Sequence, residues 1–222
     1  MKRSFFIFTL TLLALTGFIG RAQAQEGAKV GFRASPLIGW ASTVLDSTKT
    51  KPLGLENKAG LGFAFDFVFT YGFSENFAFK TGVTIATKSL KSTTAVPLLG
   101  NVDSKTNLTA IEIPLGFKFR SPEIGDGIYI VGHFGVNPEI NVQNKVITTV
   151  GSLTTEQVDV DGIRLITGSF APGAGVDWEF DWGTLEFAAT YHWGLLPYTN
   201  PDKFGGYKSR MNAIALNVGY FF

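Results

Sequence analysis

The chain has 222 residues, no cysteine and a formal net charge of +1. The length favours a single domain, and the lack of cysteine excludes a disulfide framework and thiolate chemistry. Glycine occurs 26 times, 21 residues are Phe, and capped segments of helical period are missing. Strand-forming and turn-forming residues alternate instead, so we expect an all-β fold.

The first segment of the chain, residues 1–24, has the features of a secretory signal peptide. A basic start precedes an uncharged apolar segment at 4–19, and Ala22-Gln23-Ala24 matches a cleavage site of small residues. The alternative, a transmembrane anchor, needs roughly 20 apolar residues, and this segment is shorter. Residues 1–24 hold three basic and no acidic residues, so the predicted mature domain, 25–222, has a net charge of −2. That charge argues against nucleic acid as a partner.

Eight segments then alternate large apolar residues with small or polar ones, most of them over more than ten residues. Strands of globular proteins average about five or six residues, whereas a tilted membrane strand needs about 9–11. We expect strands at 29–43, 59–73, 77–90, 107–120, 127–142, 163–178, 184–196 and 209–222.

The connections between these strands alternate in length. Three are short, at 74–76, 121–126 and 179–183. Four are long and polar, at 44–58, 91–106, 143–162 and 197–208. This alternation is typical of outer-membrane barrels, which have short periplasmic turns and longer extracellular loops. We therefore expect an eight-stranded antiparallel up-and-down transmembrane β-barrel, closed by pairing of the last strand with the first and with both termini in the periplasm.

The segment "GLGFAFDFVFTYGF" indicates which face points outward. Five of its large residues, Leu61 to Phe69, share one face, while Gly, Ala, Val and Asp66 share the other. A soluble barrel such as a lipocalin is the alternative, but its outer face should be rich in Lys and Glu. Small residues suit the narrow lumen of eight strands. We therefore expect the large residues to face outer-membrane lipid.

Aromatic residues fall near both ends of the predicted strands, as in the two girdles of membrane barrels. At the periplasmic interface we expect Tyr71, Phe119, Trp178, Tyr220 and Phe222. At the outer interface we expect Trp40, Trp193 and Tyr198. The ending "ALNVGYFF" also resembles the C-terminal recognition signal of outer-membrane proteins, with Val218, Tyr220 and Phe222 at its positions. That resemblance implies the barrel assembly machinery as a partner during biogenesis.

Several features conflict with regular strands. Proline removes a ladder donor, so we expect bulges at Pro36, Pro114, Pro138 and Pro172. The apolar phase of the sixth strand changes, which indicates an irregularity around Thr167–Ser169. The connection 143–162 has its own alternation, so the fifth and sixth strands are expected to project as a ribbon above the membrane.

The inward face carries charged residues of both signs. They are Arg33, Asp66, Lys80, Glu112, Lys118, Glu139, Asp177 and Glu186, with two histidines, His133 and His192. Unpaired buried charges are costly, so we expect a paired network that fills the lumen. A conducting path is the alternative, which the narrowness of eight-stranded barrels disfavours.

Catalysis is a third alternative, because some small outer-membrane barrels of similar size modify lipid A or cleave peptides. A Ser–His–acid set needs a hydroxyl beside a histidine, and no serine is adjacent to His192 in sequence. Two histidines without further ligands do not indicate a metal site. Gly173 and Gly175 precede no helix, so they are interpreted as lumen glycines that leave space for larger neighbours, and no phosphate loop is expected. We expect no enzyme activity, cofactor or metal.

The mature chain resembles the PorT-like outer-membrane β-barrel family. Four segments carry the likeness: "IEIPLGFKF" (111–119), "GAGVDWEF" (173–180), "ATYHWGLLPYTN" (189–200) and "LNVGYFF" (216–222). The resemblance implies an outer-membrane location in a two-membrane bacterium. We expect a monomeric, non-enzymatic structural or interaction protein of the envelope. Alternatives are an accessory component of secretion or surface assembly, in contact with a protein partner, and a lipid-modifying enzyme.

Overall fold

The computed structural model describes residues 27–48, 50, 54–96 and 100–222. The predicted signal peptide, 1–24, lies outside these residues. Within these residues the regular elements are eleven strands of one antiparallel sheet, which confirms the all-β prediction. None of the described segments forms a helix long and apolar enough to cross a membrane.

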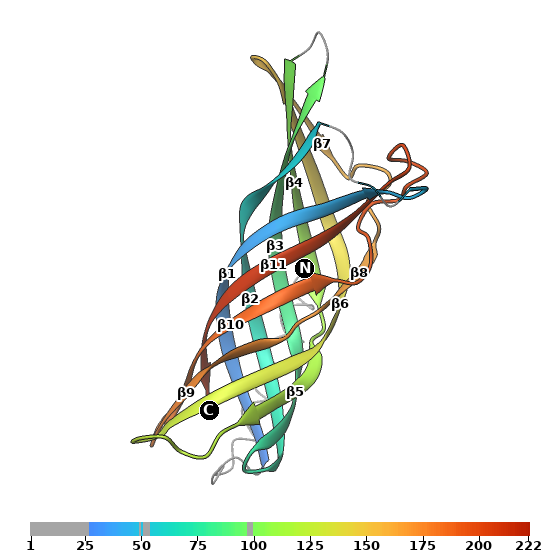
Figure 1. Ribbon diagram of the computed structural model, residues 1–222. Coiled ribbons are helices and arrows are strands. Elements are labelled where there is room, and N and C mark those ends of the chain that lie inside the picture. Colours follow the sequence, from blue (N-terminus) through green and yellow to red (C-terminus); the bar gives the residue numbers. More distant parts are fainter. Residues whose placement is uncertain (1–26, 49, 51–53, 97–99) are drawn as a thin grey trace, which may run out of the picture.

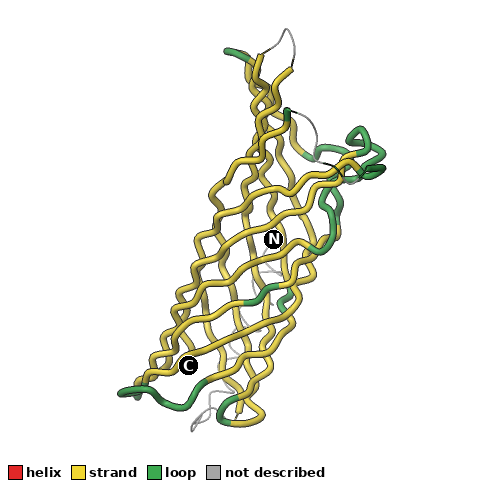
Figure 2. The backbone as a smooth tube through the Cα atoms, in the orientation of Figure 1, coloured by secondary structure: helices red, strands yellow, loops and turns green. Residues whose placement is uncertain are grey.

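The sheet closes into a barrel, because β1 pairs with β2 on one side and with β11 on the other (Figures 1 and 2). The strands are β1 (Gly27–Leu45), β2 (Leu55–Ser74), β3 (Phe77–Val96), β4 (Gly100–Glu112), β5 (Leu115–Arg120), β6 (Ile128–Val150), β7 (Leu153–Val158), β8 (Ile166–Phe170), β9 (Gly173–Phe180), β10 (Gly183–Gly194) and β11 (Tyr207–Phe221). β4 and β5 together form one wall strand, and so do β8 and β9. The described wall therefore has eight strands, as predicted.

The remaining strand, β7, pairs only with β6 and extends it into a ribbon. This ribbon and the upper part of β4 rise above the rest of the barrel in Figure 1, which confirms the predicted projection. The prediction of a loop at 91–106 is largely wrong, because β3 runs to Val96 and β4 starts at Gly100. The Thr, Ser and Lys residues of this segment place polar side chains on both faces of the paired strands. The alternation of apolar and polar residues therefore did not reveal these strands.

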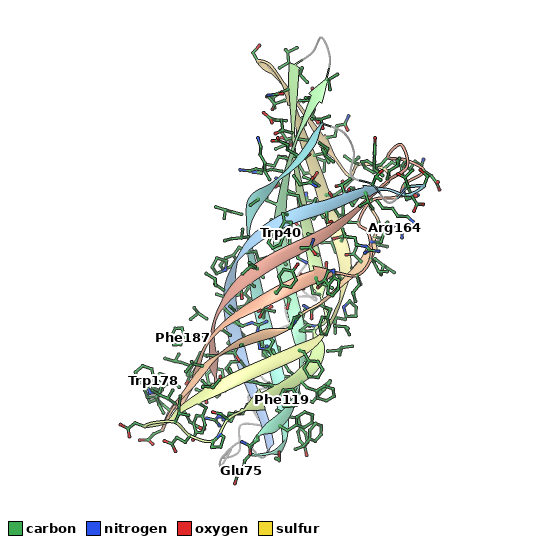
Figure 3. The ribbon with its side chains drawn as sticks, viewed as in Figure 1. Trp40, Glu75, Phe119, Arg164, Trp178 and Phe187 are labelled. Atoms are coloured by element: carbon green, nitrogen blue, oxygen red, sulfur yellow. The ribbon has the colours of Figure 1, made fainter. Side chains whose placement is uncertain are left out.

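The two faces of the wall differ as predicted. Outward residues such as Leu61 and Phe63 have exposed fractions of 78% and 51%, while inward Asp66 is 2% exposed. Phe119 and Trp178 lie toward the short-turn end, which Glu75 marks in Figure 3, and Trp40 lies toward the opposite end. The prediction for Tyr198 is wrong. It is buried inside the barrel, because the segment after β10 folds back across the mouth.

The four prolines produce no bulges, contrary to the prediction. The β1–β2 register continues unshifted past Pro36, and the β6–β8 register continues past Pro138. At Pro114 and Pro172 the strand is interrupted, but the register is the same on both sides. Each proline removes one donor without adding a residue, and neighbouring bonds such as Ile113 N–H to the Pro138 carbonyl, 3.0 Å, persist.

The sixth wall strand also differs from its prediction. Thr167 and Ser169 are buried in the same phase as Asp177, so there is no irregularity between them. The alternation of outward apolar residues shifts from odd to even positions earlier in the chain, since Leu165 and Ile166 are both exposed just where β8 begins. The strand is interrupted later, at 171–172.

The register shifts of the upper wall lie in β2 and β6. Between Ala59 and Phe63, β2 has one residue more than β3, and Val142 of β6 is unpaired opposite β4. Gly60 fits the first bulge because a Cβ there would lie 2.6 Å from the Ser89 carbonyl carbon. Each bulge reverses the parity of its strand, so different residue sets face inward above and below it.

Candidate functional site

The lower part of the lumen holds a group of charged side chains that we call the central cluster: Arg33, Asp66, Lys80, Lys118, Asp177 and Glu186. The Arg33 Nε donates to Asp66 Oδ2 at 2.6 Å, and its Nη1 lies 3.6 Å from Glu186 Oε1. Lys118 Nζ donates to Glu186 at 2.7 Å and to Asp177 at 2.9 Å. Thr84 donates a further hydrogen bond to Asp66. Lys80 is buried and lines a small cavity with Arg33.

A second group, the upper cluster, lies nearer the mouth and centres on Lys88. Its Nζ lies 2.7 Å from Glu112 Oε1 and 2.9 Å from Glu139 Oε2. Glu139 also accepts hydrogen bonds from Ser169 at 2.9 Å and Thr167 at 3.2 Å. All three charged side chains are 3% exposed or less.

At the periplasmic end Glu179 makes two ion pairs, with Arg120 and with Lys29, which we call the rim pairs. It lies 2.5 Å from Arg120 Nη2 and 3.3 Å from Lys29 Nζ. The Arg120 guanidinium also stacks over Tyr129, 3.3 Å from the ring centroid. Glu179 keeps more contact with solvent than the carboxylates deeper inside.

The two clusters and the rim pairs together contain six cationic and six carboxylate side chains. Charges buried in a low-dielectric interior are tolerated when they are paired and hydrogen-bonded. The cavities left around them have volumes of about 20–30 Å³, enough for isolated water molecules. The described lumen is therefore filled by its own side chains.

Both histidines lie in the lumen but lack the partners of a catalytic set. His133 Nε2 lies 2.8 Å from Thr190 Oγ1, which also accepts a bond from Asn217 at 2.7 Å. The Nδ1 atoms of His133 and His192 are buried without a hydrogen-bond partner, so no carboxylate orients either ring. The described residues contain no group of three or more His, Cys, Asp or Glu placed to hold a metal ion.

The interpretation of Gly173 as a space-giving residue fits this geometry. A Cβ at Gly173 would lie 2.5 Å from the His133 Cε1 atom. The glycine therefore leaves the room that this imidazole occupies.

The end of β11 presents different residues to its two sides. Val218 and Phe222 are exposed outward, and Tyr220 Oη donates to the Trp182 carbonyl at 2.6 Å. Phe221 points inward, is 3% exposed and lies below Lys118, whose Nζ is 5.2 Å from the ring centroid. This ring helps to close the periplasmic end of the lumen.

Sequence reasoning missed Lys29, Lys88 and Arg120. Each has the parity of inward residues that were recognised on the same strand, so continuing the alternation further along would have found them. Lys88 follows Thr84 and Ala86, and Arg120 follows Lys118.

Above the upper cluster, an apolar collar crosses the lumen. It consists of Ala41, Leu90, Leu108, Tyr198 and Met211, all buried. The segment carrying Tyr198 is held by the neighbouring connection: Arg164 N–H donates to the Tyr198 carbonyl at 2.7 Å, and Asn200 N–H donates to the Gly162 carbonyl at 2.8 Å. Lys203 pairs with Asp161 at 2.8 Å, and this hydrogen bond lowers the pKa of the Asp161 carboxyl.

A closed antiparallel barrel with an apolar exterior, aromatic ends and a charged, filled interior defines a transmembrane β-barrel protein. Residues 22–200 match the family described as "Outer membrane protein beta-barrel domain". The chain belongs to this family, and its location is the outer membrane. No curated protein matches the chain.

Among solved structures, the chain is similar to OprG from Pseudomonas aeruginosa, with 14% identity over 91% of this chain and 99% of that one, and a TM-score of 0.49. It is also similar to Neisserial surface protein A, with 13% identity over 88% and 98% and a TM-score of 0.43. Ail, the attachment invasion locus protein of Yersinia pestis, has 15% identity over 89% and 99% and a TM-score of 0.38.

Proposed function

We propose that the protein is a non-conducting, non-enzymatic outer-membrane barrel that anchors an extracellular ribbon for contact with another envelope component. The observation that carries this proposal is the filled lumen, in which the central and upper clusters occupy the space that a pore would need. With the interior closed, the surfaces left for function are the lipid face and the parts outside the membrane. The barrel acts as a monomer surrounded by outer-membrane lipid.

The ribbon supports a role in contact. All six residues of β7 are exposed, and among the described residues the strand pairs with β6 alone, so in this part of the chain its other edge has free backbone donors and acceptors. Such an edge can pair with an extended segment of another protein. Leu153, 76% exposed at the tip, adds apolar surface.

Site-specific photo-crosslinking in living cells tests this role. A photoreactive residue replacing Leu153 should give a discrete protein adduct at native expression levels. The matched control replaces Ile85, an exposed residue in the lipid-facing band of β3, and should give no protein adduct. Absence of an adduct from Leu153, or equal adducts at both positions, would contradict the proposal.

A narrower role, as an accessory of protein secretion or surface assembly, is favoured by the resemblance to the PorT-like family in "IEIPLGFKF" and "ATYHWGLLPYTN". It predicts that deleting the gene removes specific proteins from the culture medium or cell surface, and that the intact gene restores them. An unchanged set of secreted and surface proteins would leave the general anchoring role alone.

The proposal that the protein is not an enzyme is supported by the lumen geometry, where neither histidine has a carboxylate partner among the described residues and both lie inside the wall. Lipid A from cells with and without the protein should therefore have the same mass spectrum. A mass difference that depends on the protein would establish a lipid-modifying enzyme instead.

We also propose that residues 1–24 direct export and are removed, and that the aromatic end of β11 is recognised by the barrel assembly machinery. N-terminal sequencing of the mature protein should begin at Gln25. An N-terminus that retains the apolar segment would indicate an anchor.

A further inference from the structure

A cavity larger than those around the charged clusters lies at the extracellular mouth, above the apolar collar. Its volume is about 290 Å³, close to the lower end of the range of small-molecule sites, about 300–1,000 Å³. Leu90 and Tyr198 belong both to the collar and to the lining of this cavity. The cavity, which we call the mouth pocket, is therefore closed toward the charged lumen.

One wall of the mouth pocket is polar and comes from β2, β3 and β4. It carries Asn57, Ser92, Thr94, Ser104 and Thr106. Asn57 is directly opposite Ser92, and Ser92 is directly opposite Ser104, so these three form a row across the strands. Asn57 faces inward because the β2 bulge reverses the parity of the strand above Gly60.

None of these five side chains makes a hydrogen bond within the described part of the chain, although all are at least partly buried. Each hydroxyl can both donate and accept, and the amide offers one acceptor and two donors. The wall therefore presents a set of hydrogen-bonding groups that only water or a ligand can satisfy.

The facing wall is apolar and aromatic. It carries Tyr198, Phe204, Tyr207, Ile163 and Ala41. Its threonine and serine hydroxyls are already used within the protein: Thr43 bonds Ser209 at 2.9 Å, and Thr199 accepts from the Ser209 N–H at 2.9 Å. This wall offers flat rings and aliphatic groups and few free polar atoms.

The charge of the lining is low. The described lining contains no carboxylate, and its one ammonium group, Lys91, belongs to an exposed residue. A charged ligand would lose hydration without gaining a buried partner of opposite charge. A fully apolar ligand would leave the row of Asn57, Ser92 and Ser104 without hydrogen-bond partners, which is also unfavourable.

We propose that the mouth pocket binds one uncharged sugar ring. The C–H face of a pyranose would pack against Tyr198 and Phe204, and its hydroxyl edge would bond the row of Asn57, Ser92 and Ser104. A pyranose combines an apolar face with an edge of hydrogen-bond donors and acceptors. These two surfaces match the apolar wall and the polar wall of the pocket. Because the apolar collar closes the pocket toward the lumen, the pocket can hold only a single sugar ring or the terminal ring of a longer sugar.

Methyl-labelled protein in lipid nanodiscs tests this inference by NMR, with glycosidic detergents kept out of the preparation. The probes are four neutral methyl pyranosides that differ in hydroxyl configuration, with glucuronate as the charged probe and cyclohexanol as the apolar one. At least one neutral pyranoside should give saturable shifts at the Leu55, Leu90 and Ile163 methyls, with a dissociation constant on the order of 1 mM. Glucuronate and cyclohexanol should bind more weakly.

Two variants distinguish the contribution of the polar wall to binding from general effects of mutation on the barrel. Combining Asn57→Leu with Ser92→Ala should weaken pyranoside binding at least about tenfold while leaving the heat-modifiable gel shift of the folded barrel intact. The matched control, Thr154→Val on the distant strand β7, should bind as the parent does.

Three results would overturn the inference. One is the absence of saturable shifts with any neutral pyranoside up to about 100 mM. Another is tighter binding of cyclohexanol that the Asn57→Leu, Ser92→Ala variant does not weaken, which would make the pocket a site for apolar molecules. The third is tighter binding of glucuronate than of every neutral probe.

Discussion

The barrel interior is filled by different chemistry below and above the apolar collar. Below the collar, the carboxylates pair with Arg33, Lys88 and Lys118 at 2.6–3.6 Å. Above it, uncharged hydroxyls line a cavity, and several have no hydrogen-bond partner among the described residues. The lower part is surrounded by lipid, so its polar groups must satisfy one another, whereas water at the mouth can satisfy free hydroxyls.

The largest expected effect comes from removing the cation of the upper cluster. Lys88→Met leaves the Glu112 and Glu139 carboxylates buried without a neutralising cation, which should lower the free energy of unfolding by about 3–5 kcal/mol. Urea unfolding in lipid vesicles measures the change. Lys91→Met, three residues along the same strand but exposed, should change it by no more than about 0.5 kcal/mol. Equal losses in both variants would show that the cluster is not a buried, interdependent unit.

The lipid-facing band should be more sensitive to charge than the ribbon above it. Phe65→Arg places a cation in the outward band of β2 and should cost about 2–4 kcal/mol of folding stability. Thr154→Arg in the exposed strand β7 should stay within about 0.5 kcal/mol. Comparable values in the same vesicles would mean that Phe65 does not face hydrocarbon.

A charge at the aromatic C-terminus should affect assembly more than stability. Phe222→Lys lies at the interface, so its cost to the folded state should be about 0–1 kcal/mol. If the end of β11 is an assembly signal, this variant should insert poorly in cells but refold almost normally into detergent. Phe73→Lys, at an exposed aromatic of the same end, is the control that should insert normally. Normal insertion of Phe222→Lys would remove the recognition role, and failure of refolding would make Phe222 chiefly structural.

The smallest expected effect concerns the exposed ion pair between Lys203 and Asp161. This pair joins the segment after β10 to the segment after β7 at the mouth of the barrel. Lys203 lowers the pKa of Asp161, so Lys203→Met should raise it toward the ordinary value, as an NMR titration of the carboxyl would show. A lowered carboxyl pKa stabilises the fold above the unfolded-state pKa, and this contribution is lost as the pH falls through the folded-state pKa. Because the pair is exposed, no measurable change in overall stability is expected.

The matched control for this pair is Lys145→Met, which breaks a separate ion pair with Glu156 and should leave the Asp161 pKa unchanged. If Lys203→Met also leaves it unchanged, the two connections are not held together in solution as described.

The sequence predicted the closed barrel, its outward face and the inward charges, because alternation with a period of two reports both the strand and its sides. The same rule would have extended to Lys88 and Arg120. It could not locate the bulges at Gly60 and Val142, since one extra residue reverses the parity without changing composition. It also could not place Tyr198, whose inward position depends on how a connection folds back, or show that Pro36 and Pro138 fit an unshifted register.

Single-channel recording of the purified protein in planar lipid bilayers tests the filled lumen most directly. Because the central and upper clusters occupy the lumen and Phe221 lies across its periplasmic end, we predict little or no steady conductance. Large, stable openings of the unmodified protein would contradict this account and establish a pore instead.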